Sequence, residues 1–394
     1  MGLKILMLGW ELPPFNSGGL GEACLGLVQA LVKKGADITF VLPRKVNVKA
    51  NGFKVVFADV DEDLLSTTNV YTTSSEWSML FHNHPMPPDF VLGALKFGER
   101  VRELAKKYNA DLIHAHDWLT FPGGIAAKSV LKKPLVTHVH STEFDRTGGH
   151  FPNPTIVSIE KKGLEYADKV ISVSNFTKKM LTHNYGINPE KIEVVHNGVM
   201  SNNRKYLAPA LSTFKDLGYK VVLYLGRITL QKGPEYFVRA AKKVLEYEEK
   251  TIFVVVGSGD MQEAMIAEAG YSGILDKMIF TGFLRGEEKD RLYQAADLYV
   301  MPSVSEPFGI TPLESIANGT PVLVSKQSGV SEVIEHSLKV DFWDTDEMAN
   351  KIIAVLEHKS LKNVLISESS KELKNINWEN AAEKCFSVYN QLIY

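Results

Sequence analysis

Two glutamates, Glu306 and Glu314, lie near the two ends of a short segment, SEPFGITPLES, at residues 305–315. The seven residues between them include one glycine and two prolines, so the segment is short and stiff. Paired carboxylates can hydrolyse a glycoside, bind a metal ion or mark the start of a helix. The order Thr-Pro-Leu-Glu at 311–314 predicts a capping box, with Thr311 at the N-cap and Glu314 at the third helical position.

Two cations follow an apolar run in the second half of the chain. Arg227 and Lys232 come directly after the strand-like segment KVVLYLG at 220–226. A planar guanidinium and a flexible ammonium at the end of a strand suit a diphosphate, although a pair of surface cations has the same pattern. Gly257 adds a glycine turn after the next apolar run.

A glycine-rich segment, NSGGLGE at 16–22, separates the first apolar run from the first helical pattern. Its glycines allow close backbone approach to a ligand, and a following helix would offer N–H groups to an anion. The spacing is not G-x-G-x-x-G, and no acidic residue ends the second strand, so a dinucleotide site is not supported. A plain tight turn is the alternative.

Four histidines alternate along two apolar segments, HAHDW at 114–118 and THVHS at 137–141. Alternation on a strand places the two side chains of each pair on the same side. Four histidines suggest zinc, but no nearby cysteine or glutamate completes a known ligand spacing. We therefore predict no metal, and one catalytic or sugar-binding histidine with the others packed.

The elements that must position these residues alternate along the chain. Short apolar runs are followed by amphipathic helical patterns, which is typical of parallel sheets covered on both faces. In the pattern that starts after the glycines, four residues are predicted on one buried face: Leu25, Val28, Leu31 and Val32. The alternation breaks at 197–220 and then restarts, so two sheet domains are predicted, joined near residues 198–218.

Length and composition are consistent with this organisation. A chain of 394 residues is too long for one ordinary core, and a net charge of −2 gives no reason to expect nucleic acid as a partner. Two cysteines exclude a disulfide framework and fit a reducing compartment. No apolar run reaches the ~18–20 residues of a membrane span. We expect a cytoplasmic protein with no integral membrane segment.

Taken in order, these motifs resemble the retaining GT-B glycosyltransferases. The residues that carry the resemblance are GWELPPFNSGGLGEA, HAHDW, NGV, GRITLQKG and EPFGITPLESIANGTPVLVS. The chain is most similar to glycosyltransferase family 4 and the related family 5 glycogen and starch synthases. The resemblance implies an α/β fold of two Rossmann-like, doubly wound parallel-sheet domains facing a deep cleft. The domains would be 1–200, completed by a crossing helix at 378–394, and 201–377.

The resemblance also implies roles for individual residues. The catalytic group would be His140, near the sugar's reacting face, Arg227 and Lys232 on the diphosphate, and Glu306 facing the donor sugar. Glu314 would bind the ribose hydroxyls. The remaining donor-binding residues would be Gly18, Gly19, Gly257, Phe308, Gly309, Ile310 and Thr311. On the acceptor side we place Glu11, His116, Asp117, Asp145 and Arg146, the last two because their segment, 141–154, directly follows His140.

Two positions depart from the family pattern. Asn16 stands where the glycogen synthases have a lysine, and Met200 follows Asn-Gly-Val where the family often has an aspartate. The predicted activity is a metal-independent transfer of glucose from ADP- or UDP-glucose to an α-1,4-glucan or maltooligosaccharide. The alternatives are a family 4 enzyme with another nucleotide-sugar or with a lipid or small-molecule acceptor, a nucleotide-sugar 2-epimerase, and a two-lobed binding protein without chemistry. The sequence does not distinguish ADP from UDP.

Overall fold

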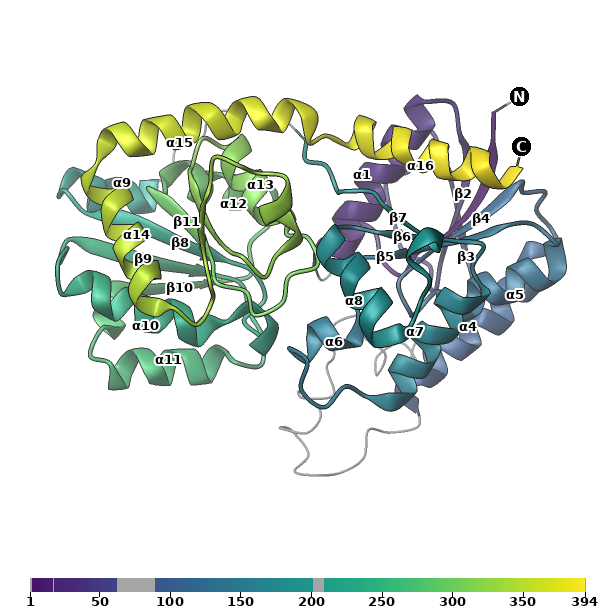
Figure 1. Ribbon diagram of the computed structural model, residues 1–394, viewed down its shortest axis with the longest axis horizontal. Coiled ribbons are helices and arrows are strands. Elements are labelled where there is room, and N and C mark those ends of the chain that lie inside the picture. The colour runs from purple at the N-terminus through teal and green to yellow at the C-terminus, as the bar shows by residue number, and fades with distance from the viewer. Residues whose placement is uncertain (1, 17, 62–88, 201–208, 394) are drawn as a thin grey trace. The chain divides into compact units, whose positions relative to one another are not determined.

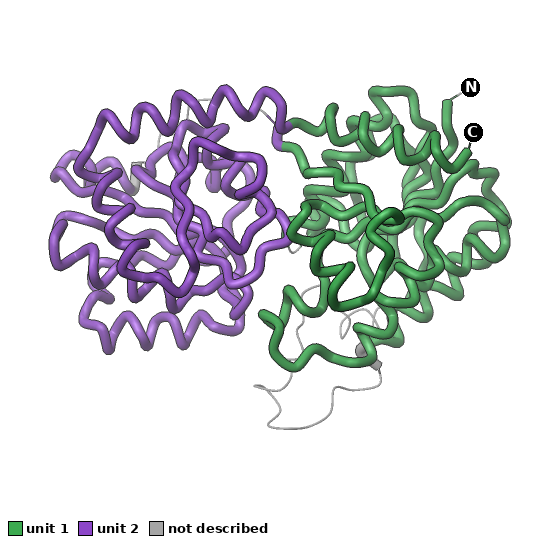
Figure 2. The backbone as a smooth tube through the Cα atoms, viewed as in Figure 1, with its two compact units in different colours: residues 1–198, 377–394 green, residues 199–376 purple. Residues whose placement is uncertain are grey.

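The computed structural model describes residues 2–16, 18–61, 89–200 and 209–393. The chain divides into two compact units, shown in Figure 2. Unit 1 comprises Met1–Gly198 and Asn377–Tyr394, and unit 2 comprises Val199–Ile376. These bounds differ by at most two residues from the predicted domain ranges. Residues 201–208 of the predicted linker lie outside the described part of the chain.

Unit 1 is built on a parallel sheet that, in the described residues, has seven strands in the order β3-β2-β1-β4-β5-β6-β7. The strands are β1 Lys4–Leu8, β2 Asp37–Leu42, β3 Lys54–Phe57, β4 Leu112–His116, β5 Leu135–Val139, β6 Lys169–Ser172 and β7 Ile192–Val194. The strand order reverses between β1 and β4, because β2 lies on one side of β1 and β4 on the other. In open α/β sheets, ligands bind beyond the carboxyl ends of the strands at such a switch point.

Helices cover this sheet (Figure 1). They are α1 Gly19–Lys33, α4 Asp89–Ala105, α5 Phe121–Leu131, α6 Glu143–Arg146, α7 Pro154–Tyr166, α8 Asn175–Tyr185 and α16 Trp378–Ile393, with the short 3-10 helix η1 Pro189–Lys191. The C-terminal helix α16 packs along α1, where the ring of Trp378 occupies the space that a side chain at Gly26 would need. The predicted return of the chain's last helix to the first domain is therefore seen in unit 1.

Unit 2 repeats the design with a parallel sheet that has, among the described residues, six strands in the order β10-β9-β8-β11-β12-β13. They are β8 Lys220–Leu225, β9 Thr251–Val256, β10 Met278–Gly282, β11 Leu298–Met301, β12 Val322–Ser325 and β13 Leu338–Val340. The switch point lies between β8 and β11. One apolar cluster packs on a single face of β8, β9 and β11 through alternate residues of each strand, and the residues that point to the other face are buried as well.

The helices of unit 2 are α9 Pro209–Asp216, α10 Pro234–Leu245, α11 Gln262–Tyr271, α12 Gly286–Ala295, α13 Ile310–Ala317, α14 Thr345–Glu357 and α15 Lys359–Glu372. Short 3-10 helices occur at η2 Leu230–Lys232, η3 Leu275–Lys277, η4 Gly329–Glu332 and η5 Leu373–Asn375. Helix α10 packs against α11 and α14. No helix in the described ranges combines the length and the apolar character that crossing a membrane requires.

The prediction for the first helix is partly wrong. Val28 and Leu31 are buried, but Leu25 and Val32 are only half-buried. The buried stripe of α1 runs instead through the positions that face the sheet and α16: Leu20, Cys24, Leu27, Val28 and Leu31. The observed stripe keeps Val28 and Leu31 and adds Leu20, Cys24 and Leu27, so the thiol of Cys24 is buried.

Candidate active site

The two predicted cations and one predicted carboxylate follow the two strands that flank the switch point of unit 2, and Lys232 and Glu306 are in direct contact. Arg227 and Lys232 follow β8, and Glu306 follows β11, the neighbouring strand across the reversal. The Lys232 ammonium forms an ion pair with Glu306 Oε2, and the Ser303 hydroxyl lies 3.4 Å from the same oxygen. The fold thus brings together Lys232 and Glu306, which are far apart in the chain.

Close backbone contact explains how Lys232 reaches this position. Gly233, which follows it, has a positive φ of 61°, and a Cβ there would lie 2.3 Å from the carbonyl oxygen of Pro302. Only glycine allows the turn after β8 to approach the turn after β11 so closely. The Lys232–Glu306 pair therefore depends on glycine at position 233.

Arg227 is held by its own turn. Its guanidinium donates to the Gln231 side chain at 3.1 Å, and its carbonyl accepts a hydrogen bond from the hydroxyl of the buried Tyr224 at 3.0 Å. Gly257, at the end of β9, packs against the backbone of Gly226 so closely that a Cβ would lie 1.9 Å from its oxygen. Gly257 thus shapes the turn that carries Arg227.

The loop after β11 is fastened to the segment after β12 by backbone hydrogen bonds. Glu306 N donates to Gln327 O at 2.9 Å, Gly329 N donates to Glu306 O at 2.9 Å, and Val330 N donates to Phe308 O at 2.7 Å. The side chain of Phe308 is buried. These contacts hold the loop in a fixed shape ahead of the helix that follows.

The predicted capping box is wrong. Helix α13 begins at Ile310, and its N-cap is Gly309, with a φ of 97° and no side-chain cap. Thr311 is therefore inside the first turn, where its hydroxyl lies 2.8 Å from that of Tyr299. Gly309 supplies a backbone conformation that threonine would not adopt, and so the helix starts earlier. The first N–H groups of α13 still have no acceptor within the helix, as at any helix start.

Glu314 has partners that the sequence did not predict. Its carboxylate forms an ion pair with Lys289 at 2.7 Å and lies 3.2 Å from the hydroxyl of Tyr293, both on α12. The residue is half-buried. Glu314 is therefore held by side-chain partners and not by a helix cap.

The glycine-rich segment of unit 1 leads directly into α1. Gly18 is the N-cap in an extended conformation, and Gly19 is the first helical residue and exposed. The buried Glu11 accepts a hydrogen bond from Gly21 N at 3.2 Å, and Asn16 donates to Gly18 O at 3.0 Å. Glu11 and Asn16 thus fix the turn at the start of the helix.

The four histidines form a stack at the ends of β4 and β5. Ring centroids of His114 and His116 lie 4.3 Å apart, and those of His138 and His140 are also 4.3 Å apart. Nδ1 of His116 lies 2.9 Å from Nε2 of His140, and Nδ1 of His114 lies 2.8 Å from the Tyr389 hydroxyl. Burial lowers the pKa of His140 to about 3, so its ring is neutral near pH 7.

Asp117 positions the backbone of His140. Its Oδ1 accepts hydrogen bonds from His140 N at 2.6 Å and from Ser141 N at 3.3 Å. Burial raises the pKa of this carboxyl to about 7, although the two N–H groups and Arg146 oppose the increase. Asp117 therefore acts as a backbone anchor within unit 1.

The predicted acceptor contacts of Asp145 and Arg146 do not agree with the structure. Both side chains are buried. Asp145 forms a capping box with Thr142, and the Arg146 guanidinium pairs with Glu143 at 3.1 Å and Glu160 at 2.7 Å. These contacts fix the fold of the segment after His140 and leave neither side chain exposed for an acceptor to touch.

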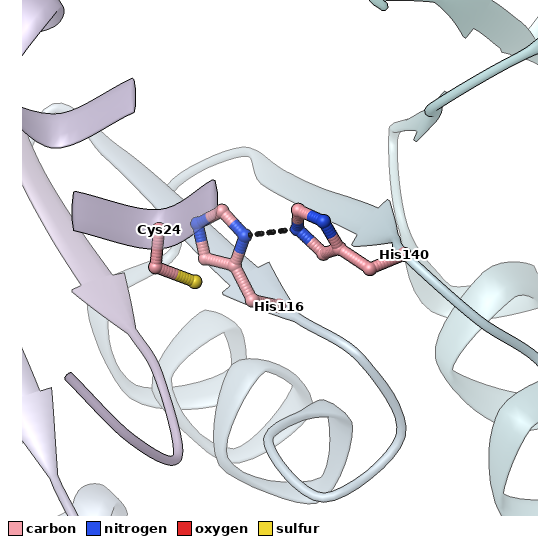
Figure 3. A group of neighbouring side chains, drawn as sticks. All are labelled: Cys24, His116 and His140. Atoms are coloured by element: carbon pink, nitrogen blue, oxygen red, sulfur yellow. Dashed lines mark hydrogen bonds between the residues drawn. The ribbon is translucent and has the colours of Figure 1, made fainter. Parts of the chain in front are cut away.

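One residue of this region was missed by the sequence analysis. Cys24, on α1, lies beside His116 and His140 (Figure 3). Cys24 is more than 90 residues from either histidine in the sequence, so it is close to them only in space and adds no recognisable ligand spacing. No sequence spacing indicates the contact, because it depends on how α1 packs across the ends of β4 and β5.

Comparison with known proteins covers both units. The family described as "Glycosyltransferase Family 4" matches residues 17–202, and "Glycosyl transferases group 1" matches residues 212–372. An uncharacterized glycosyltransferase of Methanocaldococcus jannaschii is 30% identical over 98% of either chain. A glycogen synthase of Mycobacterium tuberculosis is 28% identical over 84% of this chain and 80% of its own. A D-inositol 3-phosphate glycosyltransferase of Rhodococcus jostii is 29% identical over 76% of this chain and 70% of its own.

Solved structures share the fold at low sequence identity. Sucrose-phosphate synthase from Thermosynechococcus elongatus superposes with a TM-score of 0.80 at 21% identity, over 99% of each chain. HepE of Anabaena in complex with UDP-glucose superposes with a TM-score of 0.72 at 20% identity, over 99% of this chain and 100% of its own. These two comparisons support the fold alone.

Proposed function

Because this chain belongs to glycosyltransferase family 4 and has the GT-B fold, we propose that it is a glucosyltransferase of the glycogen-synthase type. It transfers glucose from ADP- or UDP-glucose to the non-reducing end of an α-1,4-glucan or maltooligosaccharide, with retention of configuration. The observation that carries this proposal is the Lys232–Glu306 ion pair at the switch point of unit 2, with Arg227 in the same turn as Lys232 after β8. The glycogen synthase of M. tuberculosis supports the choice of sugar and acceptor.

The charge of this group suits departure of a nucleoside diphosphate. As the bond between the anomeric carbon and the phosphate oxygen breaks, negative charge develops on the diphosphate. Arg227 and Lys232 stabilise that charge, and each such contact is worth about 2.7–4 kcal/mol of barrier. Donor binding would draw the Lys232 ammonium toward phosphate and away from Glu306, which then faces the sugar. Because two protein cations supply the charge, no metal ion is required for this step.

Three other groups complete the proposed donor site. Glu314 binds the ribose hydroxyls, and the N–H groups at the start of α13 bind sugar hydroxyls or phosphate. His140, being neutral, is a hydrogen-bonding partner for the sugar and not a proton donor at neutral pH. The acceptor hydroxyl attacks the anomeric carbon on the face that the diphosphate leaves, and its proton passes to the departing phosphate oxygen.

A second candidate has a specific observation in its favour. The chain is similar to D-inositol 3-phosphate glycosyltransferases over about three quarters of its length. A family 4 enzyme with another nucleotide-sugar, or with a small-molecule or lipid acceptor, would use the same unit 2 group. The difference between the two candidates lies in the sugar and the acceptor, and not in the diphosphate contacts.

A donor–acceptor matrix tests the proposal. ADP-glucose, UDP-glucose and UDP-N-acetylglucosamine are each incubated with maltooligosaccharide or with inositol phosphate, and released nucleoside diphosphate and glycosylated product are quantified. We expect turnover with a glucose donor and maltooligosaccharide, and an α-linked product by NMR. Turnover only with inositol phosphate would favour the second candidate, and stoichiometric binding without release would show a binding protein.

A further inference from the structure

Cys24, His116 and His140 present three metal-binding atoms to one another inside unit 1. The Sγ of Cys24 and one ring nitrogen of each histidine all lie within 4.8 Å of one another. Figure 3 shows the thiol beside the His116 ring and the two rings joined through their nitrogens. The three residues come from α1, from the end of β4 and from the residue after β5.

Among the described residues, several ring nitrogens of the histidines near Cys24 are buried without a hydrogen-bond partner. In the described part of the chain, the buried atoms His116 Nε2, His140 Nδ1 and both ring nitrogens of His138 make no hydrogen bond. A buried polar atom without a partner costs about 1–3 kcal/mol. Such groups are usually paired, so this cluster is polar and incompletely satisfied. The ion proposed below takes the two facing nitrogens, His116 Nδ1 and His140 Nε2, and the outer nitrogens carry the ring protons.

We propose that Cys24, His116 and His140 bind one divalent transition-metal ion of the zinc type, with the fourth coordination position open. A thiolate and two imidazoles are ligands that zinc and cobalt accept in tetrahedral geometry. With metal–nitrogen bonds of ~2.0–2.1 Å, tetrahedral ligand nitrogens lie ~3.3 Å apart, so the 2.9 Å contact between the two rings widens only slightly. His140 is half-buried and His116 fully buried.

Metal binding changes the protonation of the ligands in a defined way. The Cys24 thiol loses its proton to solvent and forms the metal–sulfur bond. The ring that donates in the His116–His140 hydrogen bond shifts its proton to its other nitrogen, which frees both facing nitrogens for the metal. Burial, followed by the charges of Asp117 and Glu11, raises the pKa of the free thiol.

The site has a consequence for turnover, and this step rests on the proposed function. His140 is the residue proposed to contact the donor sugar, so a metal ion on His140 competes with that contact. A zinc-type ion would therefore inhibit transfer by raising the donor KM. A second candidate metal group, formed by His114, His116 and His138, is fully buried and shares His116 with the first. An ion bound there would not contact His140 directly.

Cobalt binding provides a readout that is independent of activity. Purified metal-free protein is titrated with Co²⁺, and the thiolate-to-cobalt charge-transfer band and the visible bands of tetrahedral cobalt are recorded. We expect one cobalt per chain in the wild type, no thiolate band in Cys24→Ser, and an affinity loss of at least tenfold in Cys24→Ser and in His116→Ala. The matched control is Cys385→Ser, which removes the other buried thiol and should keep the band.

Turnover is then measured with and without Zn²⁺. Cys24→Ser should keep the metal-free activity and lose at least tenfold of the zinc sensitivity, while Cys385→Ser stays as sensitive as the wild type. If Cys24→Ser is misfolded by circular dichroism, Cys24→Ala replaces it. Absence of the thiolate band in the wild type, or its persistence in the Cys24 variant, would overturn the site. Cobalt binding without zinc inhibition would keep the site and refute the assignment of His140 to the sugar.

Discussion

Replacing Lys232 by alanine has two effects. It removes a proposed diphosphate contact, and it leaves Glu306 without its counter-ion in a position where the carboxylate side chain is only 9% exposed. An effect on activity alone would therefore not separate a catalytic role from a structural one. The two roles differ in how they respond when the charge of Glu306 is also removed.

The expected losses of activity and of stability in Lys232→Ala follow from the role and the burial of the ion pair. Loss of one contact that strengthens in the transition state costs about 2.7–4 kcal/mol, which is a ~100- to 1,000-fold fall in kcat/KM. Removing one partner of a buried ion pair costs about 3–5 kcal/mol of stability. Because the Lys232 side chain is 20% exposed, water can reach the remaining charge, and we expect no more than about 3 kcal/mol.

A double-mutant cycle separates the two effects. Lys232→Ala, Glu306→Gln and the double variant are compared by thermal unfolding and by kcat/KM for the nucleotide-glucose. The double variant should regain most of the lost Tm, since no buried charge is left unpaired, but should stay at least ~100-fold less active than Glu306→Gln alone. As a control, Lys326→Ala breaks an exposed pair with Asp341 in the same unit and should change the stability by less than about 1 kcal/mol.

The reasoning fails if Lys232→Ala loses less than tenfold of kcat/KM while remaining folded. It also fails if the double variant is as active as Glu306→Gln, because Lys232 would then act only through Glu306. A loss of activity that follows the loss of Tm across the cycle would show a purely structural pair.

Three further predictions concern single side chains. Glu314→Gln should raise the donor KM about tenfold, measured by initial rates, while Lys289→Ala keeps the carboxylate and should leave the KM within a factor of about three. Arg146→Ala should lower the stability of unit 1 by about 3–5 kcal/mol in thermal unfolding, because two buried carboxylates lose their partner; an unchanged Tm with a raised acceptor KM would instead restore the direct acceptor contact. Burial raises the pKa of Glu160 from 4.5 to about 7, so the folded chain holds this proton more tightly than the unfolded chain does. The stabilisation is complete below about pH 4.5 and is lost as the pH rises through 7, by about 3 kcal/mol in total; Glu160→Gln should remove this slope from unfolding curves between pH 5 and 8, and parallel curves for the two proteins would contradict it.

Much of the fold could be predicted because central parallel strands are buried on both faces. Segments such as 220–225 and 251–256 are almost entirely apolar, and their limits are easy to recognise. The strands β7 and β13 were not predicted. Each has three residues and lies at the edge of its sheet, where burial is partial and the apolar pattern is too short to read.

The site was predictable where topology determines position. Residues that follow β8 and β11 lie close together because those strands are neighbours at a switch point, as the Lys232–Glu306 ion pair shows, while the roles of both residues stay predictions. Contacts that depend on helix packing were not predictable. Cys24 reaches the histidines, and Lys289 reaches Glu314, only through the way a helix lies against its neighbours.

The capping box failed for a different reason. Threonine, proline and glutamate in that order are compatible with a helix start at Thr311, and local propensity favours it. However, Gly309 is bent sharply where the preceding loop is fastened to the segment after β12, and the helix begins there. The tertiary contacts of the loop override the local signal, and the N-cap lies two residues earlier than predicted, at Gly309 and not at Thr311.

The predicted site residues of the two units differ in charge. Among the predicted site residues of unit 1, Arg146 is the one cation, and it is buried and paired with two carboxylates. Asn16 stands where the glycogen synthases have a lysine, so this position supplies no cation to an anion. The positive charge for a diphosphate must then come from Arg227 and Lys232. In the proposed function only Arg227 then remains, among the predicted site residues, to oppose the charge of the diphosphate. We therefore expect the loss of kcat/KM in Lys232→Ala to lie nearer ~1,000-fold than ~100-fold, as measured in the cycle with Glu306→Gln.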